Sequence, residues 1–292
     1  MPLTHLRTFR VRHYECDARG HVNDANLLRY AQETAFDASA AAGYDMARYD
    51  AMDRSWLIRE NEIEVLHALR YGDSVQVKTW VADFRRVRSR RAYEFRHASS
   101  GELVARACTD WFFLDTTTNR PANIPHELRL AFIPEGVSES GPPRDRFPAA
   151  PPPPPGAFSQ QRRAGWRDLD PAGHVNNAVY LAYVEDIGAQ LAVANGWPMA
   201  RLESEGLGIL ARYHRIEYKQ PAMLDDELEL STWLSDVSSS TAVRHTTITR
   251  LGDEALVARA RTVHVWIDRS TGQPTPIPDA LLANFTPCIA EH

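Results

Sequence analysis

The stretch Asp17-Ala18-Arg19-Gly20-His21-Val22-Asn23 recurs 153 positions later as Asp170-Pro171-Ala172-Gly173-His174-Val175-Asn176 in this chain of 292 residues. A repeat of that period indicates a duplicated domain, because solenoid units are only a few dozen residues long. Each copy places an acidic residue, a glycine turn and a helix-capping asparagine directly before an alanine-containing segment. Such a layout can hold a carboxylate near the start of a helix, so the repeat bears on both fold and function.

The similarity between the two halves continues at the same offset without gaps. Three further segments of the first half match the second: Gly43-Tyr44-Asp45-Met46-Ala47-Arg48 with Gly196-Trp197-Pro198-Met199-Ala200-Arg201, Thr79-Trp80 with Thr232-Trp233, and Val104-Ala105-Arg106-Ala107 with Val257-Ala258-Arg259-Ala260. Matches over so many positions at one fixed register are not expected by chance. They predict two tandem domains of ordinary size, residues 1–135 and 159–292.

The segment between the halves, residues 136–158, is rich in proline and contains a run from Pro151 to Pro155. Consecutive prolines favour the extended polyproline II conformation, which rises about 3.1 Å per residue. We therefore expect a linker long enough to cross a whole domain. Its simplest interpretation is a passive spacer, and the alternative is a binding site for proline-recognising modules.

The local pattern of the second half predicts one short strand, one turn and one long helix. Ala164–Trp166 is strand-like, Asp170–Gly173 has turn composition, and a helix is expected over Ala178–Asn195. Asn176 or Asn177 can cap the start of this helix. Because the helix is apolar around most of its circumference, it should be buried.

The first half agrees in outline, with a helix expected over Ala25–Ala42 and a glycine stop at Gly43. Strand-like runs follow the helix in each half: Ser74–Trp80, Arg91–Phe95, Val104–Leu114, Glu227–Trp233, Thr246–Arg250 and Val257–Ile267. One buried helix followed by a meander of antiparallel strands predicts an α+β fold in which a sheet wraps round the helix.

The bulk composition argues against several classes of function. A net charge of −5 and a pI near 6.1 provide no overall positive field, so nucleic acid is not an expected partner. The N-terminus lacks a basic stretch followed by an apolar core, and no apolar run could span a bilayer, so we expect a cytoplasmic protein without membrane insertion. The three cysteines lack metal-ligand spacing, which predicts reduced thiols, no metal site and no redox cofactor.

These motifs resemble those of the hotdog-fold acyl thioesterases, the group typified by 4-hydroxybenzoyl-CoA thioesterase. Asp168-Leu169-Asp170-Pro171-Ala172-Gly173 closely matches that family's Asp-x-Asp-Pro-Ala-Gly turn, and Gly173–Tyr180 is similar to its acyl-CoA and acyl-carrier-protein (acyl-ACP) branches. Leu27–Ala35 and the end from Trp111 to Pro121 resemble the N-terminal half of tandem acyl-ACP thioesterases. The resemblance implies two tandem hotdog domains, each an antiparallel sheet wrapped round a long central helix, packed as a pseudo-dimer within one chain.

The resemblance also implies a catalytic residue. In this family the aspartate at the position of Asp170 acts as nucleophile or general base, and Asp17 takes the same place in the first copy, as a second or vestigial site. Plant-type acyl-ACP thioesterases place an asparagine two residues later, where this chain has Ala172 and Arg19, and an acidic residue where it has Pro221. The plant catalytic set is therefore incomplete, and the single-aspartate scheme of the 4-hydroxybenzoyl-CoA branch fits better.

Thioester hydrolysis needs an attacking oxygen, a polarised carbonyl group and a pocket that excludes water. A carboxylate supplies the first, and backbone N–H groups at a helix N-terminus can stabilise the oxyanion. We expect the residues after each aspartate to form its substrate-binding and oxyanion surroundings: Gly173, His174 and Asn176 in one copy, and Gly20, His21 and Asn23 in the other. Each histidine is alternatively a structural residue that pins the turn, and each asparagine is first of all a helix cap.

Other chemistry-bearing residues near the motifs have simpler interpretations. Cys16 has Leu169 as its counterpart, so a nucleophilic thiol is not expected. Glu33 and Asp186 occupy equivalent helix positions and are solvated or paired acids unless they face the site. The arginine-rich run over residues 85–91 is either a solvated hairpin edge or a landing surface for an acidic carrier protein or coenzyme A phosphates.

The sequence thus predicts an enzyme that hydrolyses a fatty or aromatic acyl thioester, with coenzyme A or acyl carrier protein as part of the substrate and no other cofactor. The alternatives are a non-catalytic acyl-binding module and a hotdog hydratase or dehydratase, whose Asn-Pro and histidine pattern is absent. A homo-oligomer of the tandem chain is compatible with the sequence. Acyl chain length and carrier depend on pocket depth, which these motifs do not encode.

Overall fold

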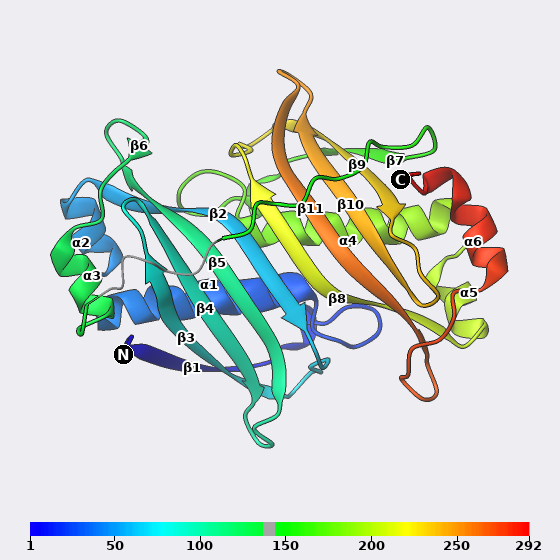
Figure 1. The fold of residues 1–292 in the computed structure, drawn as a ribbon, viewed down its shortest axis with the longest axis horizontal. Helices are drawn as coiled ribbons and strands as arrows, with labels where there is room; N and C mark the ends of the chain where they lie inside the picture. The colour runs from blue at the N-terminus through cyan, green and yellow to red at the C-terminus, as the bar shows by residue number, and fades with distance from the viewer. Residues whose placement is uncertain (137–143, 292) are drawn as a thin grey trace. The chain divides into compact units, whose positions relative to one another are not determined.

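The computed structural model describes residues 1–136 and 144–291, and the chain divides into two compact units, residues 1–146 and 147–292. The proline-rich linker is shared between the units, and its residues 137–143 lie outside the described ones. Figure 1 shows the same elements in each unit, a long helix with curved strands crossing it.

Unit 1 begins with a strand and a short 3-10 turn, and its long helix follows. The described elements, in chain order, are β1 (Thr4–Arg10), η1 (His13–Glu15), α1 (Asp24–Ala41), α2 (Met46–Ala51), β2 (Arg54–Val65), β3 (Ser74–Phe84), β4 (Arg88–His97), β5 (Leu103–Asp115), β6 (Arg120–Pro121) and α3 (His126–Phe132). Its strands pair antiparallel in the order β1-β3-β4-β5-β2, with β6 also on β5.

Unit 2 repeats this order. Its described elements are β7 (Phe158–Arg163), η2 (Trp166–Asp168), α4 (Asn177–Ala194), α5 (Met199–Ser204), β8 (Leu207–Tyr218), β9 (Glu227–Ser235), β10 (Thr241–Arg250), β11 (Ala255–Asp268), α6 (Asp279–Phe285) and η3 (Thr286–Cys288). The antiparallel order is β7-β9-β10-β11-β8, which is the order of unit 1 strand for strand. The duplication in sequence is therefore a duplication of topology.

The two long helices confirm the sequence prediction to within one residue at each end. Asn23 and Asn176 cap α1 and α4, because their side-chain oxygens accept the backbone N–H of Ala25 and Ala178. The glycine after each helix has a positive φ, +81° at Gly43. That conformation favours glycine and lets the chain leave the helix at this point.

The predicted short strand at Ala164–Trp166 is wrong. The strand in this region, β7, ends at Arg163, and Trp166 begins the 3-10 turn η2. The reason is local: the N–H of Gly165 donates to the carboxylate of Asp168 at 2.8 Å, which favours a tight turn over an extended backbone. The other predicted strand runs all lie within longer strands, β3, β4, β5, β9, β10 and β11.

Each helix packs on the edge of its own sheet where the first strand pairs. Helix α1 contacts β1 and β3, and α4 contacts β7 and β9. The burial expected for α4 is confirmed for eight of its 18 residues, among which Tyr180, Leu181, Tyr183 and Ile187 are each no more than 2% exposed. Burial of these apolar side chains is the main source of stability for this layer arrangement. In the C-terminal half of the helix, by contrast, Ala189, Gln190 and Val193 are exposed.

Two described residues within the linker, Arg144 and Phe147, each contact one of the units. Arg144 has a side chain only 8% exposed and forms ion pairs in unit 1 with Asp83 of β3 and with Asp110 of β5. In unit 2, the ring of Phe147 lies under the guanidinium groups of Arg215 and Arg259, at 5.4 and 4.5 Å. The linker is therefore fastened more closely than a passive spacer requires.

Candidate active site

The second copy of the repeated motif folds into a compact turn that carries Asp170. The backbone N–H of Asp170 donates to the carbonyl of His174 at 3.0 Å, and the N–H of Gly173 donates back to the carbonyl of Asp170 at 2.9 Å. Gly173 has a φ of +81°, which a residue with a side chain rarely adopts, so glycine is required to close the turn. The expectation of turn structure at Asp170–Gly173 is confirmed.

The carboxylate of Asp170 is largely buried, with 15% of its side chain exposed. One oxygen accepts the backbone N–H of Ala172 at 2.9 Å, and the other lies 3.5 Å from the side-chain Nδ2 of Asn176. The ring Nδ1 of His174 is 3.7 Å from the first oxygen, beyond hydrogen-bond distance. Among the described residues, Asp170 therefore accepts one short hydrogen bond, and its second oxygen accepts only the long one from Asn176. That oxygen has room to accept a proton from a bound water molecule.

Asn176 connects this carboxylate to the start of α4. Its Oδ1 accepts the N–H of Ala178 at 2.9 Å, while its Nδ2 faces Asp170. Of the described residues, none accepts a hydrogen bond from the backbone N–H of Asn177, the first residue of the helix. An open N–H at the positive end of a helix dipole is suited to bind a developing oxyanion.

Two tyrosine hydroxyl groups make hydrogen bonds at the first turn of α4. The hydroxyl of Tyr218 donates to the carbonyl of Asn177 at 2.9 Å, and the Tyr180 hydroxyl accepts the N–H of Ala222 at 3.0 Å. Burial raises the pKa of Tyr180 to about 12, so this phenol stays neutral at physiological pH. The carbonyl of Ala222 in turn accepts the N–H of Val175, so helix, turn and loop are tied together.

The first copy makes the same turn around Asp17 with a different side-chain environment. Asp17 is exposed, and one of its oxygens accepts two backbone N–H groups, from Arg19 at 2.8 Å and from His21 at 3.0 Å. Among the contacts of the described residues, no side chain donates a hydrogen bond to this carboxylate. Gly20 has a positive φ of +77°, close to the +81° of Gly173 in unit 2. This geometry is that of a turn-stabilising aspartate.

The two histidines also differ in their surroundings. Burial and the neighbouring Arg70 lower the pKa of His21, so the neutral imidazole is favoured in unit 1. Asn23 caps α1, with its Oδ1 accepting the N–H of Ala25 at 3.0 Å, and no contact with Asp17 accompanies it among the described residues. The cap function expected for both asparagines is thus present in both units, whereas the link from cap to carboxylate occurs in unit 2.

The sequence motifs did not reveal one pair of residues in each unit. Asp168 accepts the hydroxyl of Tyr183 at 2.7 Å, and Glu15 accepts the hydroxyl of Tyr30 at 2.5 Å. Each acid precedes its tyrosine by 15 positions, and both pairs fall at the same register of the duplication. The common spacing is the one feature of the sequence that could have indicated these pairs. It is a weak signal, because the whole turn and the start of the helix separate the acid from the tyrosine.

The remaining candidates are explained by local structure. Burial raises the pKa of Cys16, which disfavours a thiolate nucleophile. Asp186 is paired with Arg162 at 2.9 Å and is 66% exposed, and Glu33 lies 3.4 Å from Arg7 and is 54% exposed. Both helix acids are therefore solvated and paired, in agreement with their simpler interpretation.

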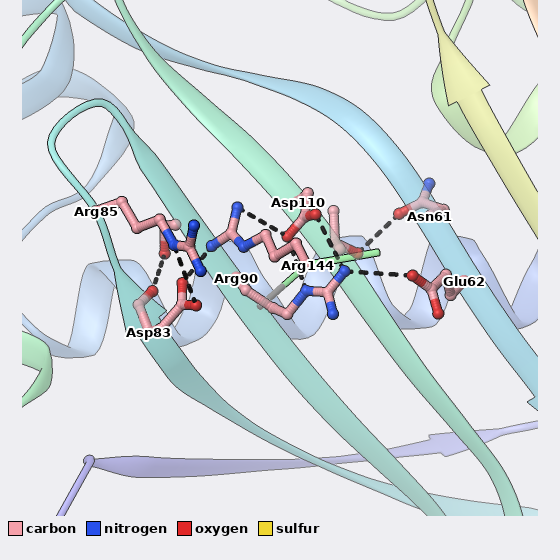
Figure 2. A network of polar contacts seen from close by, with 9 residues as sticks. Asn61, Glu62, Asp83, Arg85, Arg90, Asp110 and Arg144 are labelled. Atoms are coloured by element: carbon pink, nitrogen blue, oxygen red, sulfur yellow. Dashed lines mark hydrogen bonds and ion pairs between the residues drawn. The ribbon is translucent and has the colours of Figure 1, made fainter. Parts of the chain in front are cut away.

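The arginine run is divided between exposed and internal positions. Figure 2 shows Arg90 and Arg144 among the acidic groups of this part of unit 1; Arg90 pairs with Asp110 at 2.9 Å and with Glu62 at 3.2 Å. Arg91 is only 7% exposed. Because Arg90 is ion-paired within the unit and Arg91 is buried, a landing surface for a carrier would have to rely on the exposed Arg85, Arg86 and Arg88.

Two family profiles match the chain, one in each unit. The profile described as "Acyl-ACP thioesterase N-terminal domain" matches residues 2–132, and the profile described as "Thioesterase-like superfamily" matches residues 164–285. Together they cover the secondary structure of both units and leave the proline-rich linker unmatched.

Curated relatives match nearly the whole chain at low identity. An acyl-[acyl-carrier-protein] hydrolase from Cuphea viscosissima is 24% identical over 279 residues, covering 92% of this chain and 64% of the relative. A palmitoyl-acyl carrier protein thioesterase from Gossypium hirsutum is 26% identical over 277 residues, covering 89% of this chain and 63% of the relative. The chain thus spans a little under two thirds of the length of these chloroplastic relatives.

Solved structures match the fold. A putative oleoyl thioesterase from Lactobacillus plantarum has a TM-score of 0.76 at 18% identity and covers 90% of this chain and 96% of its own. A 12:0-ACP thioesterase from Umbellularia californica has a TM-score of 0.72 at 22% identity, and the match covers 90% of this chain and 94% of that one.

None of the described helices is long and apolar enough to cross a membrane. Unit 1 resembles the acyl-ACP thioesterase N-terminal domain and unit 2 the thioesterase-like superfamily, and the chain has the fold of the solved thioesterases.

Proposed function

We propose that the protein hydrolyses acyl thioesters and that Asp170 is the carboxylate that activates the attacking water. One observation carries this proposal. The Asp170 carboxylate lies beside the side chain of Asn176, which caps α4, and the first backbone N–H of that helix, that of Asn177, has no acceptor among the described residues. A general base and an oxyanion donor are thus tied to one capping side chain. Both functions are needed at a thioester carbonyl.

The chemistry follows from this arrangement. Water attacks the thioester carbonyl carbon while Asp170 takes one of its protons, and the carbonyl oxygen becomes an oxyanion beside the N–H of Asn177. When the tetrahedral intermediate collapses, the carbon–sulfur bond breaks and the thiolate receives the proton, leaving a free acid and a carrier thiol. Direct attack by the carboxylate, through an anhydride, is the alternative route that the family scheme allows.

We further propose an acyl group carried by acyl carrier protein as the substrate. The relatives from Cuphea and Gossypium are named for hydrolysis of acyl carrier protein thioesters, and the profile of unit 1 carries the same name. Coenzyme A thioesters are the competing substrate. The packing of the two units as a pseudo-dimer, and any further oligomer of the chain, stay predictions of the sequence.

The test is release of free thiol by the full chain from acyl carrier protein and coenzyme A thioesters of graded chain length, followed with a thiol reagent. We expect turnover by the wild type and a loss of roughly 10²- to 10⁴-fold in kcat for Asp170→Asn, because a positioned general base contributes about that much. Circular dichroism of the variant controls for folding, since asparagine has nearly the size of aspartate.

Three results would contradict the proposal in different ways. Unchanged hydrolysis by Asp170→Asn would remove Asp170 from the mechanism. Tight acyl binding without thiol release would instead favour an acyl-binding module. Hydration of an enoyl thioester, without thiol release, would favour a hydratase.

A further inference from the structure

A buried acid–tyrosine pair links the Asp170 turn to the middle of helix α4. The Oδ2 of Asp168 accepts the hydroxyl of Tyr183 at 2.7 Å and the backbone N–H of Gly165 at 2.8 Å. Tyr183 lies in the second turn of α4 and is 1% exposed. Asp168 precedes Asp170 by two residues, so this contact fixes the chain immediately before the proposed catalytic carboxylate.

The backbone of Asp168 extends the link to the helix cap. Its carbonyl oxygen accepts the N–H of Asn176 at 2.8 Å. The side chain of Asn176 in turn caps α4 and lies 3.5 Å from the carboxylate of Asp170. The turn is therefore held on both sides of Asp170 by contacts that pass through one residue, Asp168.

Unit 1 contains the same set of hydrogen bonds, with a glutamate in place of the aspartate. The Oε2 of Glu15 accepts the hydroxyl of Tyr30 at 2.5 Å and the backbone N–H of Arg12 at 2.7 Å. The carbonyl oxygen of Glu15 accepts the N–H of Asn23 at 3.0 Å, as that of Asp168 does from Asn176. Two acids of different length that make the same set of contacts indicate that the link itself, rather than one particular side chain, defines the turn.

The tyrosine keeps its proton in this environment. Burial and the hydrogen bond to Asp168 both raise the pKa of Tyr183, so its hydroxyl remains a donor over the whole physiological range. Arg162 lies over the ring at 4.1 Å and covers the link from the outside. A carboxylate that receives a neutral donor and a backbone N–H is satisfied without moving, which gives the turn a single preferred position.

We propose that Asp168 and Tyr183 are positioning residues, which set the height and direction of the Asp170 carboxylate against the N-terminus of α4. The inference rests on the proposed function for its effect on turnover, but its structural content can be measured separately. Neither residue contacts the acyl group in this scheme. Their loss therefore reduces the rate of the chemical step without removing substrate binding.

The central experiment compares Tyr183→Phe with the matched variant Tyr30→Phe in the full chain. For Tyr183→Phe we expect kcat to fall roughly 10- to 100-fold, because a displacement of about 1 Å can cost that much, and KM to stay within about twofold. Tyr30→Phe should keep kcat within about twofold. Rates are measured well below the melting temperature and per folded molecule, so that simple destabilisation does not lower them.

A rescue experiment uses the alternative that the chain itself provides. Asp168→Ala should lose activity at least as strongly as Tyr183→Phe, whereas Asp168→Glu should recover most of the lost kcat because Glu15 makes the equivalent contacts in unit 1. A role in general stability alone would not predict that a change of side-chain length restores kcat at unchanged KM.

Hydrogen–deuterium exchange makes the test independent of catalysis. Tyr183→Phe should speed exchange of amides over residues 169–176, and Tyr30→Phe should do so over residues 16–23. Unchanged exchange in the turn, or a wild-type kcat for Tyr183→Phe, would overturn the positioning role. A chain in which Asp170→Asn retains activity while exchange responds to Tyr183→Phe would overturn the proposed function and leave the link intact.

Discussion

The Asp17 turn and the Asp170 turn follow the same backbone route and differ in what surrounds the carboxylate. Both close through a hydrogen bond from the glycine N–H to the aspartate carbonyl, at 3.0 Å in unit 1 and 2.9 Å in unit 2. Asp17 is exposed and accepts two backbone N–H groups, whereas Asp170 is largely buried, accepts one and lies beside the Asn176 amide. The motif thus specifies the same turn in both units, and the carboxylate is partly enclosed beside its helix cap in unit 2.

The two units also differ outside the motif. In unit 2, Tyr180 and Tyr218 support the helix start through Ala222 and the carbonyl of Asn177. The residues at the same register of unit 1 are Leu27 and Val65, which have no hydroxyl group. Duplicated motifs can therefore keep their backbone geometry while the distant side chains that tune them diverge.

The largest expected effect separates the two aspartates. Asp17→Asn should leave kcat within about twofold of the wild type, whereas Asp170→Asn should lose roughly 10²- to 10⁴-fold. The reason is that Asp17 is exposed and lacks the contact that joins the Asp170 carboxylate to the cap residue Asn176. Thiol release under identical conditions measures both variants, and an equal loss in the two would show that both units work.

A second effect concerns how each unit holds the linker. Arg144→Ala should lower the free energy of unfolding by about 3 kcal/mol, because among the described residues it leaves the buried carboxylate of Asp83 with only Arg85, at 4.0 Å, as counter-ion. Phe147→Ala should cost about 1 kcal/mol or less, since its cation–π contacts are partly exposed. Denaturant unfolding measures both, and equal losses would contradict this ranking.

The last effect, about as small as that of Phe147→Ala, concerns the two long helices. A Cβ atom at Gly188 of α4 would lie 2.6 Å from the guanidinium carbon of Arg244, whose Nη1 donates to the carbonyl of Val184 at 2.7 Å. Gly188→Ala should therefore destabilise the protein by a net amount of about 1 kcal/mol, despite the higher helix propensity of alanine. At the same register α1 has Ala35. A higher melting temperature for Gly188→Ala would show that Arg244 moves aside at little cost.

Much of the fold was predictable because its signals are local. Capping asparagines and terminal glycines placed both long helices to within a residue, and period-two runs placed most of the strands. Strands β1, β2, β6, β7 and β8 and the short helices were not predicted. The strand expected at Ala164–Trp166 was wrong because a carboxylate three residues after Gly165 captured its N–H group.

The candidate site was predictable only in part. The turn around Asp170, the cap at Asn176 and the positive φ of Gly173 follow from neighbouring residues, so the motif indicates them. The link from Asp168 to Tyr183 joins residues 15 positions apart through a folded helix, and the paired state of Arg90 depends on Asp110 of the next strand. Contacts of this kind require the sheet and helix to be assembled first.

The sequence alone indicates a tandem duplication and a resemblance to one superfamily. It also indicates where each copy forms its turn and begins its helix, because turns and caps depend on residues a few positions apart. The tertiary structure decided which aspartate is buried beside its cap and which is exposed, and which arginines are used in internal ion pairs. The physical reason is that burial and charge pairing depend on side chains from distant strands. Two motifs that share five of seven residues therefore acquire different surroundings only after folding.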